Sequence, residues 1–133
     1  MADMKSQIET RNIYYYPDIL VTCDPRDREF THYKKYPCLI VEVLSPNTEA
    51  FDRGDKFFDD QQLDSLQEYV LISQKHQRLD CFRRNSDGLW TLQFYDVGSE
   101  IRLESVNFQM DLDALYEDVI FPKNDEEQTA SAE

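Results

Sequence analysis

Residues 37–44, PCLIVEVL, constrain the fold more than any other part of this sequence. The run is apolar at both odd and even positions, which is typical of a central strand covered on both faces of its sheet. One acidic residue, Glu42, interrupts it. Because burying a lone carboxylate is costly, we expect Glu42 to be paired, hydrogen-bonded or bound to a metal ion.

The remainder of the chain predicts more strands around one helix. Residues 14–22 favour a strand by their aromatic and β-branched composition, with Pro17 at its start or on a sheet edge. Residues 48–66 favour a helix that begins at Thr48 and is weakened at Gly54 by about 1 kcal/mol. Residues 23–35 predict a charged loop. Further strands are expected at 3–10, 68–73, 78–84, 89–95, 101–103 and 106–108, and a short capped helix at 111–116.

This order of elements predicts one domain, over residues 1–122, of the mixed α/β (α+β) class. Its sheet is expected to be largely antiparallel after the helix. Residues 123–133 are polar and acidic, and we expect them to form a disordered tail.

The charge restricts the partners of the protein. The 133 residues include 14 basic and 27 acidic side chains, which gives a net charge of −13. Proteins that hold nucleic acid by neutralising phosphates are usually basic, so this balance argues against broad nucleic-acid binding. Contact with DNA would need a local basic patch or a bound cation. A small basic cluster lies in the predicted loop, where a solvated surface is the commoner outcome; it comprises Arg26, Arg28, Lys34 and Lys35.

The cysteines and the apolar runs indicate the compartment. Cys23, Cys38 and Cys81 are odd in number and contain no C-x-x-C spacing, so a disulfide framework and a zinc knuckle are not expected. We expect all three to pack as small hydrophobic residues in a reducing, cytoplasmic environment. No apolar run approaches the roughly 20 residues of a membrane span, and the first residues have no apolar segment typical of a secretory signal.

Three residues suggest chemistry. Asp18 follows Pro17 at the start of one strand, Glu42 lies within the next, and Lys56 lies on the helix that comes after it. Two carboxylates can hold Mg²⁺, and a lysine can orient the attacking water or stabilise developing negative charge. Each residue also has a structural interpretation: Asp18 as a turn cap, Glu42 as a buried partner of Arg53 or Lys56, and Lys56 as a solvated helix residue.

Four segments in order resemble a known group of proteins. They are Tyr16-Pro17-Asp18, Val41-Glu42-Val43-Leu44-Ser45-Pro46, Asp52-Arg53-Gly54-Asp55-Lys56 and Glu68-Tyr69-Val70. They resemble the PD-(D/E)XK restriction-endonuclease-like superfamily, and most closely its branch of putative restriction endonucleases. The resemblance runs from about residue 3 to residue 121.

The resemblance implies a restriction-endonuclease-like fold, with a central mixed sheet and flanking helices. It also implies that Asp18, Glu42 and the backbone carbonyl of Val43 are ligands of Mg²⁺, for which Mn²⁺ could substitute. The superfamily's usual lysine lies two residues after the glutamate, where this chain has Leu44, and in this branch a lysine from the helix, matched by Lys56, takes its place. Four residues after that lysine this chain has Asp60 where an aromatic residue is expected.

The implied function is metal-dependent hydrolysis of phosphodiester bonds in DNA. Family members usually carry a helical region ahead of the first segment, so we expect an N-terminally shortened fold whose exposed sheet face is covered in a homodimer. The alternative is a nuclease fold without catalysis, which acts in homo-oligomerisation or as a subunit of a larger complex. Metal binding and DNA nicking would distinguish the two.

Overall fold

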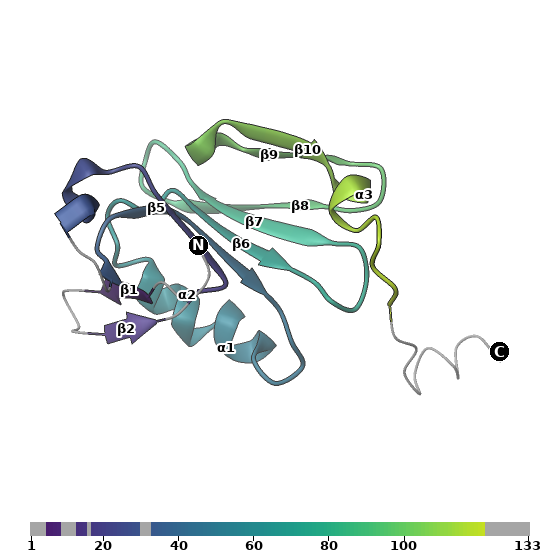
Figure 1. Ribbon diagram of the computed structural model, residues 1–133, viewed down its shortest axis with the longest axis horizontal. Helices are drawn as coiled ribbons and strands as arrows, with labels where there is room; N and C mark the ends of the chain where they lie inside the picture. Colours follow the sequence, from purple (N-terminus) through teal and green to yellow (C-terminus); the bar gives the residue numbers. More distant parts are fainter. Residues whose placement is uncertain (1–4, 9–12, 16, 30–32, 122–133) are drawn as a thin grey trace, which may run out of the picture.

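The computed structural model of the chain describes residues 5–8, 13–15, 17–29 and 33–121 (Figure 1). The helices are α1 (Glu49–Arg53), α2 (Asp55–Asp60) and α3 (Leu112–Leu115), with 3₁₀ turns η2 (Pro25–Glu29) and η3 (Glu104–Val106). The strands are β1 (Lys5–Ile8), β2 (Ile13–Tyr15), β3 (Ile19–Thr22), β4 (Tyr33–Lys34), β5 (Pro37–Val43), β6 (Glu68–Ile72), β7 (Leu79–Arg84), β8 (Trp90–Tyr95), β9 (Glu100–Leu103) and β10 (Phe108–Asp111).

The central sheet is mixed, as the sequence predicts. Its five strands lie in the order β3-β5-β6-β7-β8. β5 pairs antiparallel with β3 and parallel with β6, and α1 and α2 lie in the connection between β5 and β6. The later strands β6, β7 and β8 are antiparallel. The apolar run 37–44 therefore supplies an interior strand with neighbours on both sides, which confirms the expectation from its composition.

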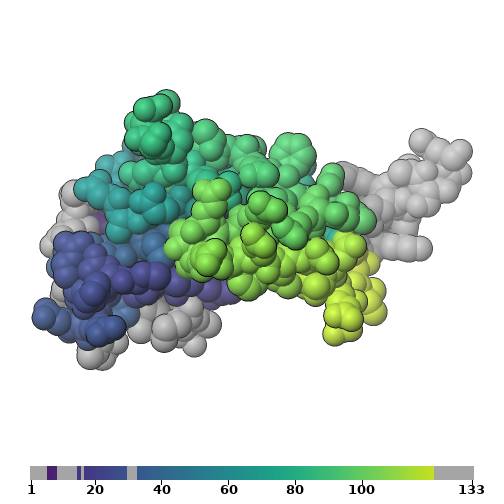
Figure 2. Space-filling view, turned by 90° about the horizontal axis from the view of Figure 1, so that it is seen from above, coloured from purple at the N-terminus to yellow at the C-terminus, as the bar shows by residue number. Residues whose placement is uncertain are grey.

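Alternate residues of β5 enter two separate cores. Leu39 and Val41 pack into a core that also contains Ile101 and Leu112. Ile40 and Leu44 pack into a second core on the opposite face, with residues that include Phe57, Leu20 and Ile8. The hairpin β9–β10 and α3 cover the first face, and α1, α2 and β1 cover the second (Figure 1). Figure 2 shows the first of these faces, where the residues of β9, β10 and α3 lie at the surface. This two-sided coverage explains why β5 is apolar at every position except Glu42.

Two predicted elements are divided in the structure. Residues 14–22 were predicted as one strand, but Pro17 and Asp18 separate β2 from β3, and only β3 joins the central sheet. β2 instead belongs to a small sheet of order β2-β1-β4, because Pro17 has no N–H with which to continue a ladder.

The helix predicted over 48–66 is likewise two short helices, which end at Asp60 and meet at Gly54. A Cβ at Gly54 would lie 3.0 Å from the Ala50 carbonyl oxygen, so the close approach there favours glycine.

The structure also bears on the loop, the later strand and the tail expected from the sequence. The charged loop 23–35 contains η2 and the short strand β4. The strand expected at 89–95 is β8, which forms the edge of the central sheet and has Tyr95 as its one buried residue. The predicted acidic tail, 123–133, lies outside the described residues. Across the described part of the chain, no helix has the length and apolar character needed to cross a membrane.

Glu68 connects the central sheet to the β9–β10 layer. It is fully buried at the start of β6. Its carboxylate accepts hydrogen bonds from the backbone N–H groups of Ser105 (2.8 Å) and Glu104 (3.2 Å), from the Ser105 hydroxyl and from Arg83 Nε (2.8 Å). Burial acts to raise the pKa of Glu68, but the bonds from Ser105 and Arg83 outweigh it and lower that pKa.

Replacing Glu68 by Gln should lower the free energy of unfolding by about 2–4 kcal/mol, because an amide nitrogen would face donors that need an acceptor. The lowered pKa means that this stabilisation is present above the ordinary value of 4.5 and is lost as the pH falls below it. Urea unfolding at pH 7 and pH 3.5 measures both effects. Glu104→Gln, at a side chain 73% exposed, is the control and should change stability by less than about 0.5 kcal/mol. Equal effects of the two variants would contradict the assignment.

Candidate functional site

The register of β5 puts Glu42 and Asp18 on one face of the sheet. Glu42 lies between Ile40 and Leu44, which pack in the core beneath the helices. Ile19 is the ladder partner of Val41, so Asp18, one residue earlier, lies across from Glu42. Both carboxylates therefore approach the carboxyl end of β5 on the side that α1 and α2 cover.

Asp18 is fixed by the backbone of the neighbouring strand. Its Oδ2 accepts a hydrogen bond of 2.6 Å from the N–H of Val43. The residue is exposed, whereas Pro17 before it is buried and anchors the turn. Asp18 thus presents a carboxylate to solvent at a defined place beside Glu42 and Val43.

Lys56 reaches the same place from α2. Its Nζ lies 2.5 Å from Glu42 Oε1 and 3.9 Å from Asp52 Oδ1. The Lys56 and Glu42 residues are 6% and 3% exposed, so this is a buried ion pair. Of the two partners predicted for Glu42, the structure selects Lys56, because Arg53 binds Glu49 and Asp80 instead. Lys56 is not a solvated helix residue.

Two buried carboxyl groups of the site were missed by sequence reasoning. Asp52 and Asp60 lie one helical turn before and after Lys56, a spacing that could have revealed them. The sequence analysis gives Asp52 only as part of the segment Asp52-Arg53-Gly54-Asp55-Lys56, and Asp60 only as a departure from the family's aromatic residue. Asp60 is fully buried, and among the described residues neither of its carboxyl oxygens has a hydrogen-bond partner.

Burial dominates the electrostatics of the site. It raises the pKa of Glu42 to about 7, with Lys56 opposing the rise and Asp52 and Asp18 adding to it. Burial also raises the pKa of Asp52, and raises the pKa of Asp60 to about 8 against the effect of Lys56. Three buried carboxyl groups, those of Glu42, Asp52 and Asp60, therefore share one ammonium group, and the exposed Asp18 adds negative charge beside Glu42. Such an excess of buried negative charge favours either protonation or a bound cation.

The residues at this place fit a hard divalent cation. Asp18 and Glu42 supply carboxylate oxygens, and Val43, the residue after Glu42 whose N–H binds Asp18, would supply its carbonyl as a third ligand. Within the described ranges, no group of three or more His, Cys, Asp or Glu side chains has the arrangement of a complete metal site. Mg²⁺ needs only one or two carboxylates, because it keeps several of its waters.

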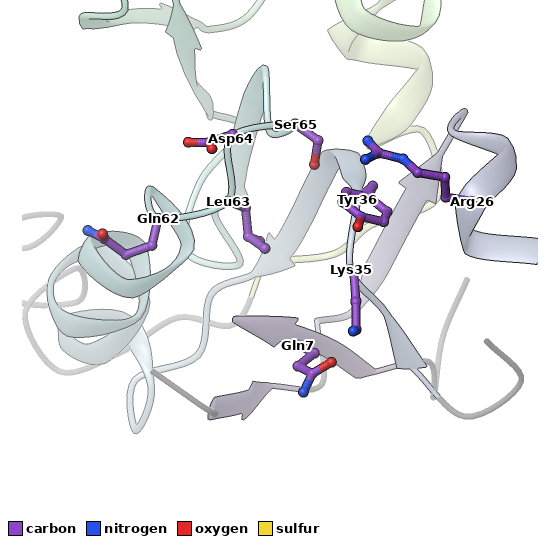
Figure 3. A pocket seen from close by; sticks show the side chains of 8 residues that line it. All are labelled: Gln7, Arg26, Lys35, Tyr36, Gln62, Leu63, Asp64 and Ser65. Carbon is purple, nitrogen blue, oxygen red and sulfur yellow. The ribbon is translucent and has the colours of Figure 1, made fainter. Parts of the chain in front are cut away.

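The basic cluster predicted in the loop lies elsewhere. Arg26 Nη2 is 2.6 Å from Asp24, and its guanidinium lies 3.6 Å from the centre of the Tyr36 ring. Lys34 Nζ donates to the Asp27 carbonyl. Together with Lys35, Arg26 and Tyr36 line a polar cavity of about 380 Å³ near the start of β5, at the opposite end of the strand from Glu42 (Figure 3). These cations are engaged within the protein and do not extend the candidate site.

Comparisons with known proteins agree with the resemblance. The family model Uma2, described as putative restriction endonuclease, matches residues 1–114. Two uncharacterised proteins of Synechocystis sp. are 42% identical over 120 residues and 33% identical over 96 residues. These matches cover 90% and 69% of this chain but only 63% and 53% of the relatives, so the chain spans little more than half of their length.

A solved structure shares the fold. It is the crystal structure of a putative nuclease belonging to DUF820 from Anabaena variabilis, with a TM-score of 0.69 and 13% sequence identity. The match covers 90% of this chain and 68% of that one. The mixed sheet with few helices is therefore a nuclease-like fold, as the sequence predicts.

Asp60→Asn tests the electrostatics of the site through stability. The folded carboxyl is neutral up to about pH 8, whereas the unfolded one ionises above its ordinary 3.8. The stability of the wild type therefore falls as the pH rises through this interval, and the Asn variant lacks that loss. We expect the variant's advantage to grow by about 1–3 kcal/mol between pH 5 and pH 7 in urea unfolding. Asp64→Asn, at an exposed position, is the control and should show no such trend. An advantage independent of pH would contradict the assignment.

Proposed function

Because the chain belongs to the Uma2 family of putative restriction endonucleases, we propose that it is a metal-dependent endonuclease that hydrolyses phosphodiester bonds in DNA. The observation that carries the proposal is the meeting of Asp18, Glu42 and Lys56 at the carboxyl end of β5. Glu42 lies on β5, Asp18 directly before the neighbouring β3, and Lys56 on α2. Two carboxylates and a lysine are the types of side chain that metal-assisted phosphodiester cleavage requires.

Each residue has a role in the proposal. Asp18, Glu42 and the carbonyl of Val43 would hold Mg²⁺ or Mn²⁺. When bound, the ion lowers the pKa of a coordinated water and neutralises charge on the phosphate. Asp18 is positioned for this by the Val43 N–H, and Glu42 by its burial in the sheet face.

Lys56 would act on the water and the phosphate. Its ammonium is already held against Glu42, with Asp52 behind it. From there it can orient the attacking water and stabilise the negative charge that develops on the phosphate. The superfamily usually has this lysine two residues after the glutamate, where this chain has the buried Leu44. Here Lys56, supplied by α2, would take its place.

DNA is the proposed substrate despite the acidic chain. The net charge of −13 argues against a broad phosphate-binding surface, so contacts with the substrate would be confined to the neighbourhood of the cation. The cation would also offset the negative field around Asp18 and Glu42. We therefore expect weak, strongly salt-dependent binding of DNA and an absolute need for the divalent ion.

The second candidate function is a nuclease fold that acts through association without cleavage. Apolar side chains on the edge strand β8 favour it: Leu92 is 49% and Phe94 56% exposed, and the strand contains neither proline nor charge to block pairing. A homodimer would cover these side chains. The dimer is compatible with either function, since Leu92 and Phe94 lie at the sheet edge farthest from β3.

Activity and metal uptake test the proposed function. Glu42→Gln, Asp18→Asn and Lys56→Met should each reduce plasmid nicking by at least about 100-fold. In calorimetric titration with Mn²⁺, Glu42→Gln and Asp18→Asn should lose binding, while Lys56→Met should keep it, because Lys56 is not a ligand. Circular dichroism of each variant establishes that it is folded.

The matched controls are Asp64→Asn and Lys75→Met, both exposed and outside the site. They should nick DNA and bind Mn²⁺ as the wild type does. Absence of Mn²⁺ binding by the wild type, or undiminished nicking by Glu42→Gln, would overturn the proposal. Metal binding without nicking by the wild type would support the second candidate.

The dimer has its own test. In analytical ultracentrifugation the wild type should sediment at twice the 15.8 kDa of one chain. Phe94→Asp should sediment as a monomer, because a charge placed there cannot be buried between copies without a partner. Val97→Asp, in the exposed turn after β8, is the control and should remain dimeric. A monomeric wild type would contradict this part of the proposal.

A further inference from the structure

Two of the three cysteines are in contact across neighbouring strands. The Sγ atoms of Cys38 on β5 and Cys23, directly after β3, lie 3.6 Å apart. Cys23 is exposed and Cys38 is half-buried. The contact lies toward the end of the β3–β5 ladder away from Asp18 and Glu42. Two thiols that are distant in sequence therefore meet at the surface.

An irregularity of the ladder accounts for the contact. Val21 pairs with Leu39 and Thr22 with Pro37, so the register shifts and Cys38 has no Cα partner in β3. Cys38 is the extra residue at this shift, and its thiol lies within hydrogen-bond distance of both the Val21 carbonyl (3.4 Å) and the Cys23 sulfur. The local distortion of the sheet thus brings the two sulfurs together.

Cys23 is the most exposed of the three thiols and therefore the most accessible to a small oxidant. A cavity of about 150 Å³ adjoins Cys23, and its walls include Arg28 and Lys34 as well as Asp24 and Asp27. Burial, together with the hydrogen bond to Cys23, raises the pKa of Cys38 to about 11, so that thiol stays protonated at neutral pH. The exposed sulfur is therefore the first site of attack, and Cys38 is the neighbour able to respond.

Cys81 is excluded from this chemistry. It is fully buried in the core beneath β9–β10, and its S–H points to Glu68 Oε2 at 3.6 Å. Burial raises its pKa to about 12. Of the three cysteines expected to pack as small hydrophobic residues, Cys81 does so, whereas Cys23 and Cys38 form a surface pair.

We propose that Cys23 and Cys38 are a reversible redox pair that hydrogen peroxide converts into an intramolecular disulfide. In the first step the Cys23 sulfur attacks a peroxide oxygen, the O–O bond breaks, and Cys23 sulfenic acid and one water form. In the second step the Cys38 sulfur attacks the Cys23 sulfur; the S–S bond forms and the S–O bond breaks. The hydroxyl group leaves with the Cys38 proton as a second water. Both sulfurs are oxidised, the peroxide is reduced to two waters, and a dithiol reductant reverses the reaction.

The disulfide would fasten β3 to β5. It closes a loop of about 15 residues, which restricts the unfolded chain, so the oxidised protein should melt about 5–10 °C above the reduced one. These two strands also carry Asp18 and Glu42, yet the redox chemistry needs neither residue and does not depend on the proposed function.

Peptide mapping of the whole chain tests the pair directly. Trypsin places the three cysteines in separate peptides, residues 12–26, 36–53 and 79–83. After native treatment with hydrogen peroxide and alkylation of remaining thiols, peptides 12–26 and 36–53 should be joined, with a mass two hydrogens below their sum. Peptide 79–83 should carry the alkyl group once the protein is unfolded. Treatment with dithiothreitol should abolish the linkage.

The variants separate the two steps. Cys38→Ser should accumulate Cys23 sulfenic acid, trapped by dimedone at a level at least about 10-fold above the wild type, because nothing resolves it. Cys23→Ser should show neither the linkage nor the adduct, and the rise in melting temperature should be absent from both variants. Equal trapping at Cys23 in wild type and Cys38→Ser would overturn the proposal. So would disulfides that join two chains through Cys23 in place of the internal linkage.

Discussion

The buried ion pair between Glu42 and Lys56 is the interaction on which the rest of the site depends. β5 is covered on both faces, so a carboxylate in it has little contact with bulk water and needs a positive partner. That partner is a lysine on α2, 14 residues later, with Nζ at 2.5 Å. α2 therefore contributes in two ways: its Phe57 packs in the core, and its Lys56 compensates the charge of Glu42.

The carboxyl groups around the Glu42–Lys56 pair outnumber the one ammonium group that could neutralise them. Asp52 and Asp60, on either side of Lys56, are buried as well, and Asp18 approaches from β3. A merely structural ion pair would gain nothing from these additional carboxyl groups, since each raises the cost of ionising the others. A site that binds a divalent cation would gain from them, because the cation offsets their negative charge. This excess of acid, in a chain whose fold is nuclease-like, is the physical argument for the proposed cation site.

Much of this arrangement could be predicted from sequence, because it is encoded locally. The two-sided apolar run gives β5, the lone Glu42 requires a partner, and the turn residues divide the later strands. What could not be predicted depends on tertiary packing. Residues 14–22 divide into β2 and β3 because the two strands join different sheets, and a Cβ at Gly54, where α1 meets α2, would lie 3.0 Å from the Ala50 carbonyl oxygen. Asp60 shows the same limit: a helical spacing indicates a shared face but not its burial.

The β3–β5 ladder joins the two chemistries of the molecule. At one end the regular register sets Asp18 across from Glu42; at the other, the shift between Val21 and Thr22 leaves Cys38 beside Cys23. A one-residue slip of β3 along β5 would separate Asp18 from Glu42, because successive residues point to opposite faces. The short β3 has few ladder bonds to resist such a slip. A disulfide at the irregular end would fix the register that keeps Asp18 across from Glu42. The thiols would therefore stabilise the arrangement of the carboxylates without contacting them.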